Sequence, residues 1–469
     1  MNEAVASRAN MGLIIAIVAV ATIGGLLFGY DSGAVNGTQA GLTEEFKLNS
    51  AWLGFTVGSL LIGCAVGAFF AGRLADVIGR RTVMILAAVL FVAGALIQGF
   101  TGIHALFVAA RFAGGMAVGA ASVLSPLYIS EVAPAQVRGR LTTVQQVMII
   151  TGLTAAFVVN YFVAQNAGGS LGELAGLHAW RWMYLAQAVP AVVFLAALFL
   201  IPESPRYLVS QGREDAARKV LTSLFGAEEA ERKIGEIRAS FSADHRPSFR
   251  DVAAPGIVFR PIVWAGIMIA TFQQFVGINI IFYYGETLWK LAGVSESVAL
   301  ERNIISGLVS IAAVFAALLT IDRIGRKPLL IIGSVGMAVT LGAMTWAFSG
   351  AGQDAAGNLV LGEIAGYIAL VAANLYVIFF NFSWGPVMWV MLGEMFPNQM
   401  RGSALAVAGL AQWGANYLVV QSFPAMADKD ALGLTGTYAI YTVAAVISIF
   451  LVRKFIQETK GKELEEMQG

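Results

Sequence analysis

Two charged residues that stand in apolar surroundings are the first candidates for chemistry. Asp31 lies near the far end of a hydrophobic run that begins near Met11, within the stretch Gly-Gly-Leu-Leu-Phe-Gly-Tyr-Asp-Ser-Gly. A helix that rises about 1.5 Å per residue places this carboxylate about 30 Å along, at the boundary of a bilayer's hydrocarbon. A carboxylate there is costly unless it pairs, faces water or binds a proton. Asp31 is therefore a candidate functional acid, and a polar cap on the helix end is the simpler alternative.

Arg111 is the expected partner of Asp31. It lies in a run that starts near His104, so it should stand about 10 Å below the same surface. In a low dielectric the attraction between the two charges offsets much of the cost of removing them from water. Protonation of Asp31 would then free Arg111, which makes the pair a possible switch. A static structural ion pair is the alternative.

The composition indicates a polytopic helical membrane protein. The 469 residues are 58% hydrophobic and 13% charged, and a soluble domain carries about twice this charged fraction. The net charge of +1 gives no indication of a nucleic-acid partner. The single Cys64 cannot form an intramolecular disulfide, and the three histidines are widely scattered. We therefore expect no metal site and no cofactor.

The apolar runs predict an all-α fold of twelve membrane-spanning helices. The predicted spans are 12–35, 51–72, 82–101, 104–129, 139–164, 180–201, 258–290, 300–321, 328–349, 361–392, 402–424 and 434–454. A charged insert with two short amphipathic helices separates the sixth span from the seventh. The predicted domains are a six-helix half over 1–202, the insert over 203–255, a second six-helix half over 256–455 and a tail over 456–469.

Basic residues predict the orientation of these spans. Arg and Lys gather in the insert, in the tail and in the loops after spans 2, 4 and 8, whereas the opposite loops carry few. The positive-inside rule therefore places both termini and the insert in the cytoplasm. We expect a multi-pass protein of the cytoplasmic (inner) membrane.

The two halves repeat one another in three places. Asp76-Val-Ile-Gly-Arg-Arg after span 2 matches Asp322-Arg-Ile-Gly-Arg-Lys after span 8. Glu131-Val-Ala-Pro-Ala-Gln-Val-Arg-Gly after span 4 matches Glu394-Met-Phe-Pro-Asn-Gln-Met-Arg-Gly after span 10, and Glu203 and Glu458 follow spans 6 and 12. Two parallel six-helix halves with a site between them are the layout of an alternating-access transporter.

The repeated charges at helix ends on one membrane face predict a latch between the halves. A single exposed pair contributes little, but a network can bias a two-state equilibrium by a few kcal/mol. Topogenic positive charge is the alternative, which accounts for the basic residues but not for the repeated glutamates. The predicted gating residues are Glu131, Arg138, Glu203 and Arg206 in one half, Glu394, Arg401 and Glu458 in the other, and Asp76, Arg80, Asp322 and Arg326.

These motifs, with Pro202-Glu-Ser-Pro-Arg and Gln273-Gln-Phe-Val-Gly-Ile-Asn, resemble the sugar porter family of the major facilitator superfamily over nearly the whole chain. One departure is Gln457, where the family usually has proline. The resemblance implies that the Asp31 of the Gly-Tyr-Asp motif accepts a proton and that Arg111 tunes it, since proton-coupled members carry aspartate there. It also implies a sugar site between the halves.

Neutral amides and flat aromatic faces suit a sugar, because amides donate and accept hydrogen bonds without the desolvation cost of charge. Three amides of span 7 would point in three directions on a regular helix, so we expect that span to bend or unwind near Gly277. Amides that act as interhelical glue and aromatics that act as plain core are the alternative. The predicted substrate residues are Gln146, Gln273, Gln274, Asn279 and Gln412 by resemblance, with Asn416, Tyr283, Trp389, Phe28, Trp413 and the weaker Trp384.

The sequence thus predicts proton-coupled symport of a monosaccharide (hexose or pentose) or related polyol by a monomer in a lipid bilayer. Facilitated diffusion on the same fold is one alternative. A carrier of another solute class would want a basic residue in the central cavity, and none stands there apart from Arg111. A non-transporting sugar sensor usually has long cytoplasmic extensions. No nucleophile–base set indicates an enzyme.

Overall fold

The computed structural model describes residues 9–243, 252–253, 258–353, 359–397, 400–428 and 430–460. Twelve helical spans long and apolar enough to cross a membrane lie in these ranges, as predicted. The N-terminal half contains α2 (Met11–Ala34) with η1 (Val35–Gly37), α4 (Ser50–Ile78), α5 (Arg80–Phe100), α6 (His104–Val132), α7 (Ala135–Ala167), and α8 (Ala179–Leu185) with α9 (Ala188–Leu198). The C-terminal half contains α14 (Pro261–Phe275) with α15 (Ile278–Leu291), α16 (Glu296–Ile324), α17 (Arg326–Ser349), α18 (Glu363–Phe382) with α19 (Trp384–Met395), α20 (Arg401–Ala427) and α21 (Gly433–Phe455).

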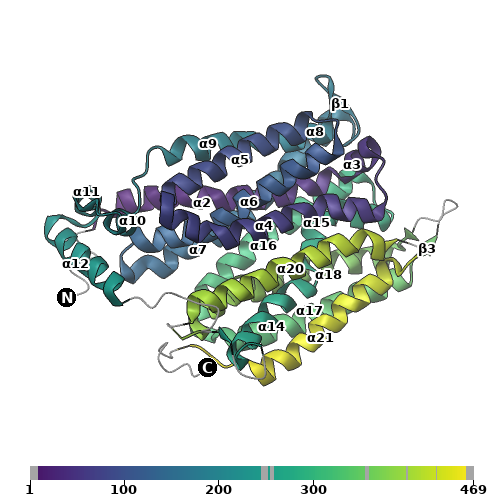
Figure 1. The fold of residues 1–469 in the computed structure, drawn as a ribbon. Coiled ribbons are helices and arrows are strands. Elements are labelled where there is room, and N and C mark those ends of the chain that lie inside the picture. Colours follow the sequence, from purple (N-terminus) through teal and green to yellow (C-terminus); the bar gives the residue numbers. More distant parts are fainter. Residues whose placement is uncertain are drawn as a thin grey trace.

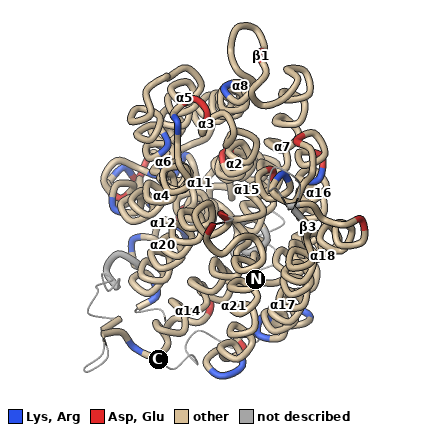
Figure 2. The backbone as a smooth tube through the Cα atoms, turned by 90° about the vertical axis from the view of Figure 1, so that its right-hand side faces the viewer, with Lys and Arg blue, Asp and Glu red and all other residues tan. Residues whose placement is uncertain are grey.

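The two halves lie side by side, with α4 packed on α20 and α7 on α16 (Figure 1). One end of the bundle, called here the insert end, carries both termini and α10 (Pro205–Ser210), α11 (Glu214–Phe225) and α12 (Ala227–Ala243). The opposite end, called the β1 end, carries α3 (Gln39–Phe46) and two small hairpins. The hairpin strands are β1 (Glu173–Leu174) with β2 (Leu177–His178), and β3 (Gly352–Gln353) with β4 (Leu359–Val360). Viewed from the β1 end, most of the chain consists of uncharged residues (tan in Figure 2).

Small residues let the helices of each half approach closely. A Cβ atom on Gly115 of α6 would lie 2.0 Å from the carbonyl oxygen of Leu60 in α4, and one on Gly119 would lie 2.1 Å from that of Cys64. Such contacts between backbones are typical of helix packing in membranes, where small side chains at an interface replace the hydrophobic drive available in water. They hold α4, and with it the backbone around Thr56, against α6.

Span 7 breaks where the sequence analysis predicted. Helix α14 ends at Phe275 and α15 begins at Ile278, with Gly277 between them at φ +84°. This left-handed conformation is accessible to glycine without a steric penalty. Span 10, predicted as one continuous run, is also interrupted, because Ser383 leaves the helical region at φ −129° and ψ −88° and separates α18 from α19.

Candidate substrate and proton-coupling site

Asp31 and Arg111 lie together inside the N-terminal half. Oδ2 of Asp31 is 3.6 Å from Nη2 of Arg111, and the two side chains are 3% and 0% exposed. The acid and the base that interrupt the apolar pattern of α2 and α6 thus form an ion pair that is removed from water. Arg111 also donates to the carbonyl oxygens of Thr56 and Val57, to Oε1 of Gln98 and to the hydroxyl of Tyr184.

These additional acceptors change what the pair can do. The carbonyl oxygens of Thr56 and Val57 accept at 3.1 and 3.2 Å, so Arg111 keeps hydrogen-bond partners whatever the charge of Asp31. Oδ2 of Asp31, in contrast, has no hydrogen bond to any residue that the structure describes. Asp31, rather than Arg111, is therefore the member of the pair with an oxygen that lacks such a hydrogen bond.

Several neutral neighbours of this pair are absent from the set of residues predicted from the sequence. Gln187, between α8 and α9, lies close enough to Asp31 to act on its charge, and Tyr184 accepts a hydrogen bond from Thr38 at 3.1 Å. Gln187 and Gln98 are 3% and 2% exposed. Both are amides in apolar runs, which is the signal that singled out the candidates in spans 5, 7 and 11 and would have found these two as well.

The break at Gly277 brings the amides of span 7 into one chain of hydrogen bonds. Asn279 donates to Oε1 of Gln274 at 2.6 Å and to Oδ1 of Asn416 on α20 at 2.7 Å. Gln274 donates to Gln273 at 2.9 Å, and Gln273 donates to the carbonyl oxygen of Trp384 at 3.2 Å. Four of the six predicted amides therefore meet inside the C-terminal half.

Two further amides remain available for a ligand. Gln412 stands one turn before Asn416 on α20 and is 6% exposed. Its Oε1 has no hydrogen-bond partner among the described residues. Gln146 lies on α7 of the other half and is half-buried. An orphaned acceptor beside a connected amide chain can take a hydroxyl donor without first breaking a protein hydrogen bond.

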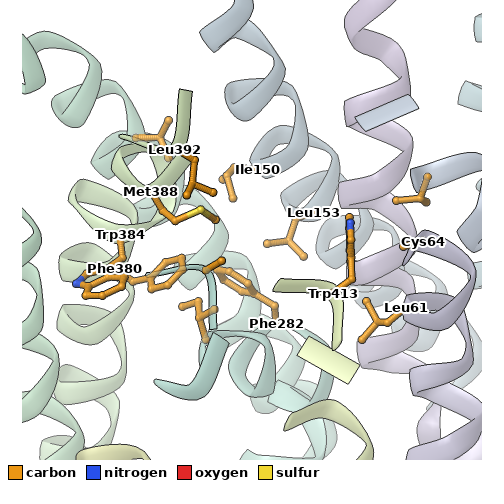
Figure 3. Packing of buried hydrophobic residues seen from close by; sticks show 14 of the residues in the cluster. Leu61, Cys64, Ile150, Leu153, Phe282, Phe380, Trp384, Met388, Leu392 and Trp413 are labelled. Atoms are coloured by element: carbon orange, nitrogen blue, oxygen red, sulfur yellow. The ribbon is translucent and has the colours of Figure 1, made fainter. Parts of the chain in front are cut away.

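The aromatic candidates divide into three groups. Phe28 of α2 packs on Trp413 of α20 with ring centroids 5.8 Å apart, so these two rings join the halves. Trp384 is 1% exposed, and its indole donates to the carbonyl oxygen of Leu330 and to Ser334. Figure 3 shows Trp413 beside Leu61 and Leu153, and Trp384 on the opposite side of the cluster. Trp389, in contrast, is 43% exposed.

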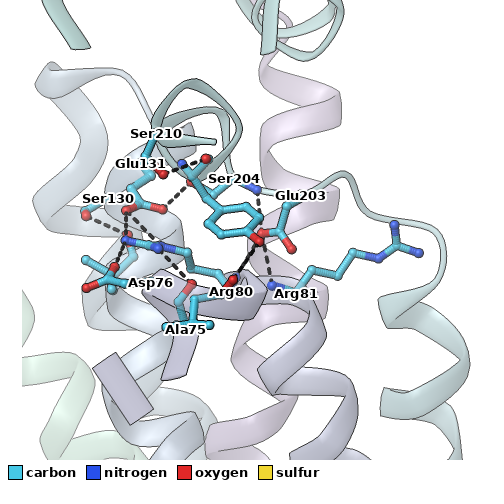
Figure 4. A network of polar contacts seen from close by, with 12 residues as sticks. Ala75, Asp76, Arg80, Arg81, Ser130, Glu131, Glu203, Ser204 and Ser210 are labelled. Atoms are coloured by element: carbon cyan, nitrogen blue, oxygen red, sulfur yellow. Dashed lines mark hydrogen bonds and ion pairs between the residues drawn. The ribbon is translucent and has the colours of Figure 1, made fainter. Parts of the chain in front are cut away.

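The charges of the insert end form one network in the N-terminal half (Figure 4). Arg80 is 2.9 Å from Asp76 and 3.2 Å from Glu131. Oε1 of Glu203 accepts the backbone N–H groups of Arg80 and Arg81 at 3.0 and 3.1 Å, at the N-terminus of α5. A carboxylate stabilises a helix N-terminus because the first N–H groups lack partners within the helix.

The C-terminal half repeats this network with its own residues. Arg326 is 3.0 Å from Asp322 and 2.8 Å from Glu394, and Glu458 accepts the N–H groups of Arg326 and Lys327, both at 3.0 Å. Burial raises the pKa of Glu458, but hydrogen bonds from backbone N–H groups outweigh it and hold the pKa below its usual value. The departure at Gln457 does not displace this glutamate from its cap.

These salt bridges differ from the predicted latch, because those of Arg80 and Arg326 join residues of the same half. The first half alone provides enough carboxylates to satisfy Arg80, so no partner from the other half is required. Arg206 interacts electrostatically with Glu131, and Nε of Arg401 donates to the carbonyl oxygen of Phe396. The side chain of Arg138 lies outside the described residues.

The halves are instead joined by hydrogen bonds at the β1 end. Asn36 donates to the carbonyl oxygen of Phe282 at 2.9 Å, and Gln39 donates to that of Tyr283. The hydroxyl of Tyr283 also accepts from Ser32 of α2 at 3.1 Å. The predicted substrate residue Tyr283 is therefore part of the contact that closes this end.

Comparisons with known proteins agree with this geometry. A family model described as Sugar (and other) transporter matches residues 17–469. A glucose transport protein of Synechocystis sp. is 45% identical over 463 residues, which cover 98% of each chain. A D-xylose-proton symporter of Escherichia coli is 38% identical over 492 residues, covering 98% of this chain and 96% of the relative.

Solved structures show the same fold. The inward open conformation of the xylose transporter XylE from E. coli matches with a TM-score of 0.81 at 37% identity, covering 97% of this chain and 99% of the other. The proton:xylose symporter XylE bound to 6-bromo-6-deoxy-D-glucose matches with a TM-score of 0.77 at 37% identity, covering 98% and 99%. These relatives are transporters and not enzymes, and they confirm the predicted family and the twelve-helix fold.

Proposed function

The chain belongs to the sugar porter family of the major facilitator superfamily, and on that premise we propose that it couples the entry of a monosaccharide, hexose or pentose, or a related polyol to the entry of protons. The observation that carries this proposal is the buried pair of Asp31 and Arg111, in which Oδ2 of the acid lacks a hydrogen bond. The proton coupling of the D-xylose relative supports the same conclusion.

Asp31 is the proposed proton acceptor. Its ionised form is stabilised by Arg111 at 3.6 Å and by Gln187. When a proton binds, the attraction to Arg111 disappears, while the carbonyl oxygens of α4 still hold the guanidinium in place. Protonation therefore changes how firmly α2 is held to α6 without displacing Arg111, and this is how we propose that proton binding alters the balance between the two states of the carrier.

The sugar binds between the halves, against the amide chain of the C-terminal half. Gln412 offers an orphaned acceptor to the hydroxyl groups of the sugar, and Gln146 approaches from the other half. Asn279 keeps both of its N–H groups on Gln274 and Asn416 and holds the amide chain beside Gln412. The ring faces of Phe28 and Trp413 cover the C–H surface of the sugar. Trp389 and Tyr283 complete the proposed site as it closes. Trp384 acts in the packing of the C-terminal half, because its N–H is already bonded there.

The halves rock about this site. We propose that residues 1–202 and 256–455 are the two moving units, that residues 203–255 form the insert between them and that residues 456–469 form the tail. The insert end faces the cytoplasm together with both termini, in keeping with the positive-inside rule. When the insert end closes, the networks around Arg80 and Arg326, each satisfied within its own half, approach one another, and Glu131, Glu394 and Arg401 add contacts between the halves. The monomer in its lipid bilayer is the proposed working unit.

Uptake by proteoliposomes tests the proposal. Labelled hexoses, pentoses and polyols are offered with and without an imposed proton gradient, to the unmutated protein and to Asp31→Asn. We expect concentrative uptake of at least one sugar only with the gradient, and Asp31→Asn should abolish accumulation while substrate exchange stays within about threefold, a loss below 1 kcal/mol in binding. Accumulation by Asp31→Asn at the unmutated level would overturn the proton role. Uptake that never exceeds equilibrium would favour facilitated diffusion.

A further inference from the structure

A second carboxylate is buried near the β1 end, and the proposed mechanism does not use it. Glu286 of α15 is 2% exposed. Its Oε1 lies 3.4 Å from Nζ of Lys290, one turn along the same helix. Its Oε2 is buried and has no hydrogen-bond partner within the described part of the chain. Lys290 is 39% exposed, so this single cation serves one oxygen of the carboxylate and is itself partly in contact with solvent.

The surroundings of Glu286 include the contact between the two halves. Its backbone N–H donates to Oδ1 of Asn36 at 3.0 Å, and Asn36 belongs to η1 of the N-terminal half. Asn303 of α16 donates to the same oxygen at 2.7 Å. A Cβ atom on the preceding Gly285 would lie 2.4 Å from Asn303 and 2.8 Å from Asn36, so the three elements are closely packed here. Burial of Glu286 therefore coincides with closure of the β1 end.

The charges around Glu286 do not compensate an ionised carboxylate. Lys290 of its own helix attracts it, and Glu296 at the start of α16 repels it. Arg302 of α16 lies instead over the ring of Trp289, 4.6 Å from its centroid. From η1 and α3 the facing side chains are the amides Asn36 and Gln39, and on the α2 side Asp31 and Arg111 act electrostatically on Tyr283.

An anion with an orphaned oxygen is costly in such a place, whereas the neutral acid is not penalised in the same way. When the halves separate at the β1 end, η1 leaves α15 and water can solvate the carboxylate. The ionised form is then the stable one near neutral pH. The two states of the carrier thus differ in their affinity for a proton at this side chain.

We propose that Glu286 takes up a proton when the β1 end closes and releases it when that end opens. The proton comes from the aqueous phase on the β1 side, binds to the Glu286 carboxylate, and returns to the same phase, so it adds nothing to the proton:sugar ratio set by Asp31. Glu286 is thus a positioning residue for the transport cycle, one that lets the pH on the β1 side set how readily this end closes. This inference rests on the proposed function only in requiring that the two halves alternate.

The test reads the conformation directly and does not depend on sugar uptake. Spin labels on Glu44→Cys and Val298→Cys, at exposed positions of α3 and α16, report the separation of the halves at the β1 end by pulsed electron paramagnetic resonance. The buried Cys64 is replaced by alanine, and Asp31→Asn is introduced in every sample so that its proton cannot contribute. Uptake or release of one proton changes the ratio of closed to open molecules by at most about tenfold per pH unit.

In the protein that keeps Glu286, we expect the ratio of closed to open molecules to fall at least about tenfold between about pH 5 and about pH 8. Glu286→Gln should stay closed across this range with less than a twofold change. Glu296→Gln is the matched control, since it removes a carboxylate that accepts a hydrogen bond from Ser170 at the same end but should retain the pH dependence.

Lys290→Met provides a second, independent variant. Without the ammonium group the ionised form of Glu286 loses the attraction of Lys290, so the midpoint of closure should move to higher pH. An unchanged pH dependence in Glu286→Gln, or no pH dependence with Glu286 present, would overturn the proposal. Either result leaves the proton role of Asp31 untouched, because that role is decided by accumulation in proteoliposomes.

Discussion

Gly277→Ala should disorganise the amide chain of the candidate sugar site. Position 277 has φ +84°, a conformation that costs a residue with a Cβ atom about 1–2 kcal/mol. The added Cβ would also lie 2.8 Å from Cγ and Cδ2 of the Tyr441 ring, and relieving such overpacking typically costs about 1–3 kcal/mol. The variant protein would therefore either carry about 2–5 kcal/mol of strain at this position, or α15 would shift relative to α14 and relieve part of that strain.

A shift of α15 would separate Asn279 from Gln274, which are 2.6 Å apart across the break. A hydrogen bond of this kind contributes about 0.5–1.5 kcal/mol, so we expect sugar affinity to fall about threefold to tenfold. Titration calorimetry on the purified protein in detergent would measure the affinity, and thermal unfolding would measure the strain. Gly409→Ala is the matched control, because no heavy atom lies within 4 Å of its added Cβ on α20. Unmutated affinity and melting temperature in Gly277→Ala would refute the reasoning.

Two other substitutions separate stability from binding. Glu458→Gln removes the charge that caps α17 and should destabilise the protein by about 0.3–1 kcal/mol near neutral pH after allowance for solvent screening. Because the folded pKa of Glu458 is lowered, its contribution is present above the unfolded value of about 4.3 and lost as pH falls through the folded value. The melting temperatures of the two proteins should therefore approach one another as the pH falls below about 4.3. Trp384→Phe leaves the Leu330 carbonyl without its indole donor, so unfolding should cost about 1–3 kcal/mol less while calorimetry shows sugar affinity within about twofold.

Local signals in the sequence were enough to predict the positions that break a regular pattern. Three amides that no straight helix could bring together required the interruption at Gly277, and the structure has it. Depth along two apolar runs was enough to predict that Asp31 and Arg111 lie near one another. In both cases the chain itself constrains the answer through rise and angle per residue.

Partners between helices are harder to predict, because the two halves repeat the same charges. Spacing alone offers Arg80 a glutamate from either half, and only packing shows that it binds Glu131 of its own half. Glu286 poses a related difficulty. With Lys290 four residues along it has the spacing of an ordinary surface pair, and its burial becomes visible only when η1 of the other half is seen against α15.

The distribution of contacts indicates how such a carrier can alternate at low cost. The charge networks at the insert end are satisfied within each half, so each half can move as a unit without leaving a buried charge unpaired. The contacts that do join the halves at the β1 end are largely neutral hydrogen bonds, such as those of Asn36 and Gln39. Each contributes only about 0.5–1.5 kcal/mol, since water replaces the lost partner on opening. Their sum is a few kcal/mol, the range in which one proton or one bound sugar can reverse the populations.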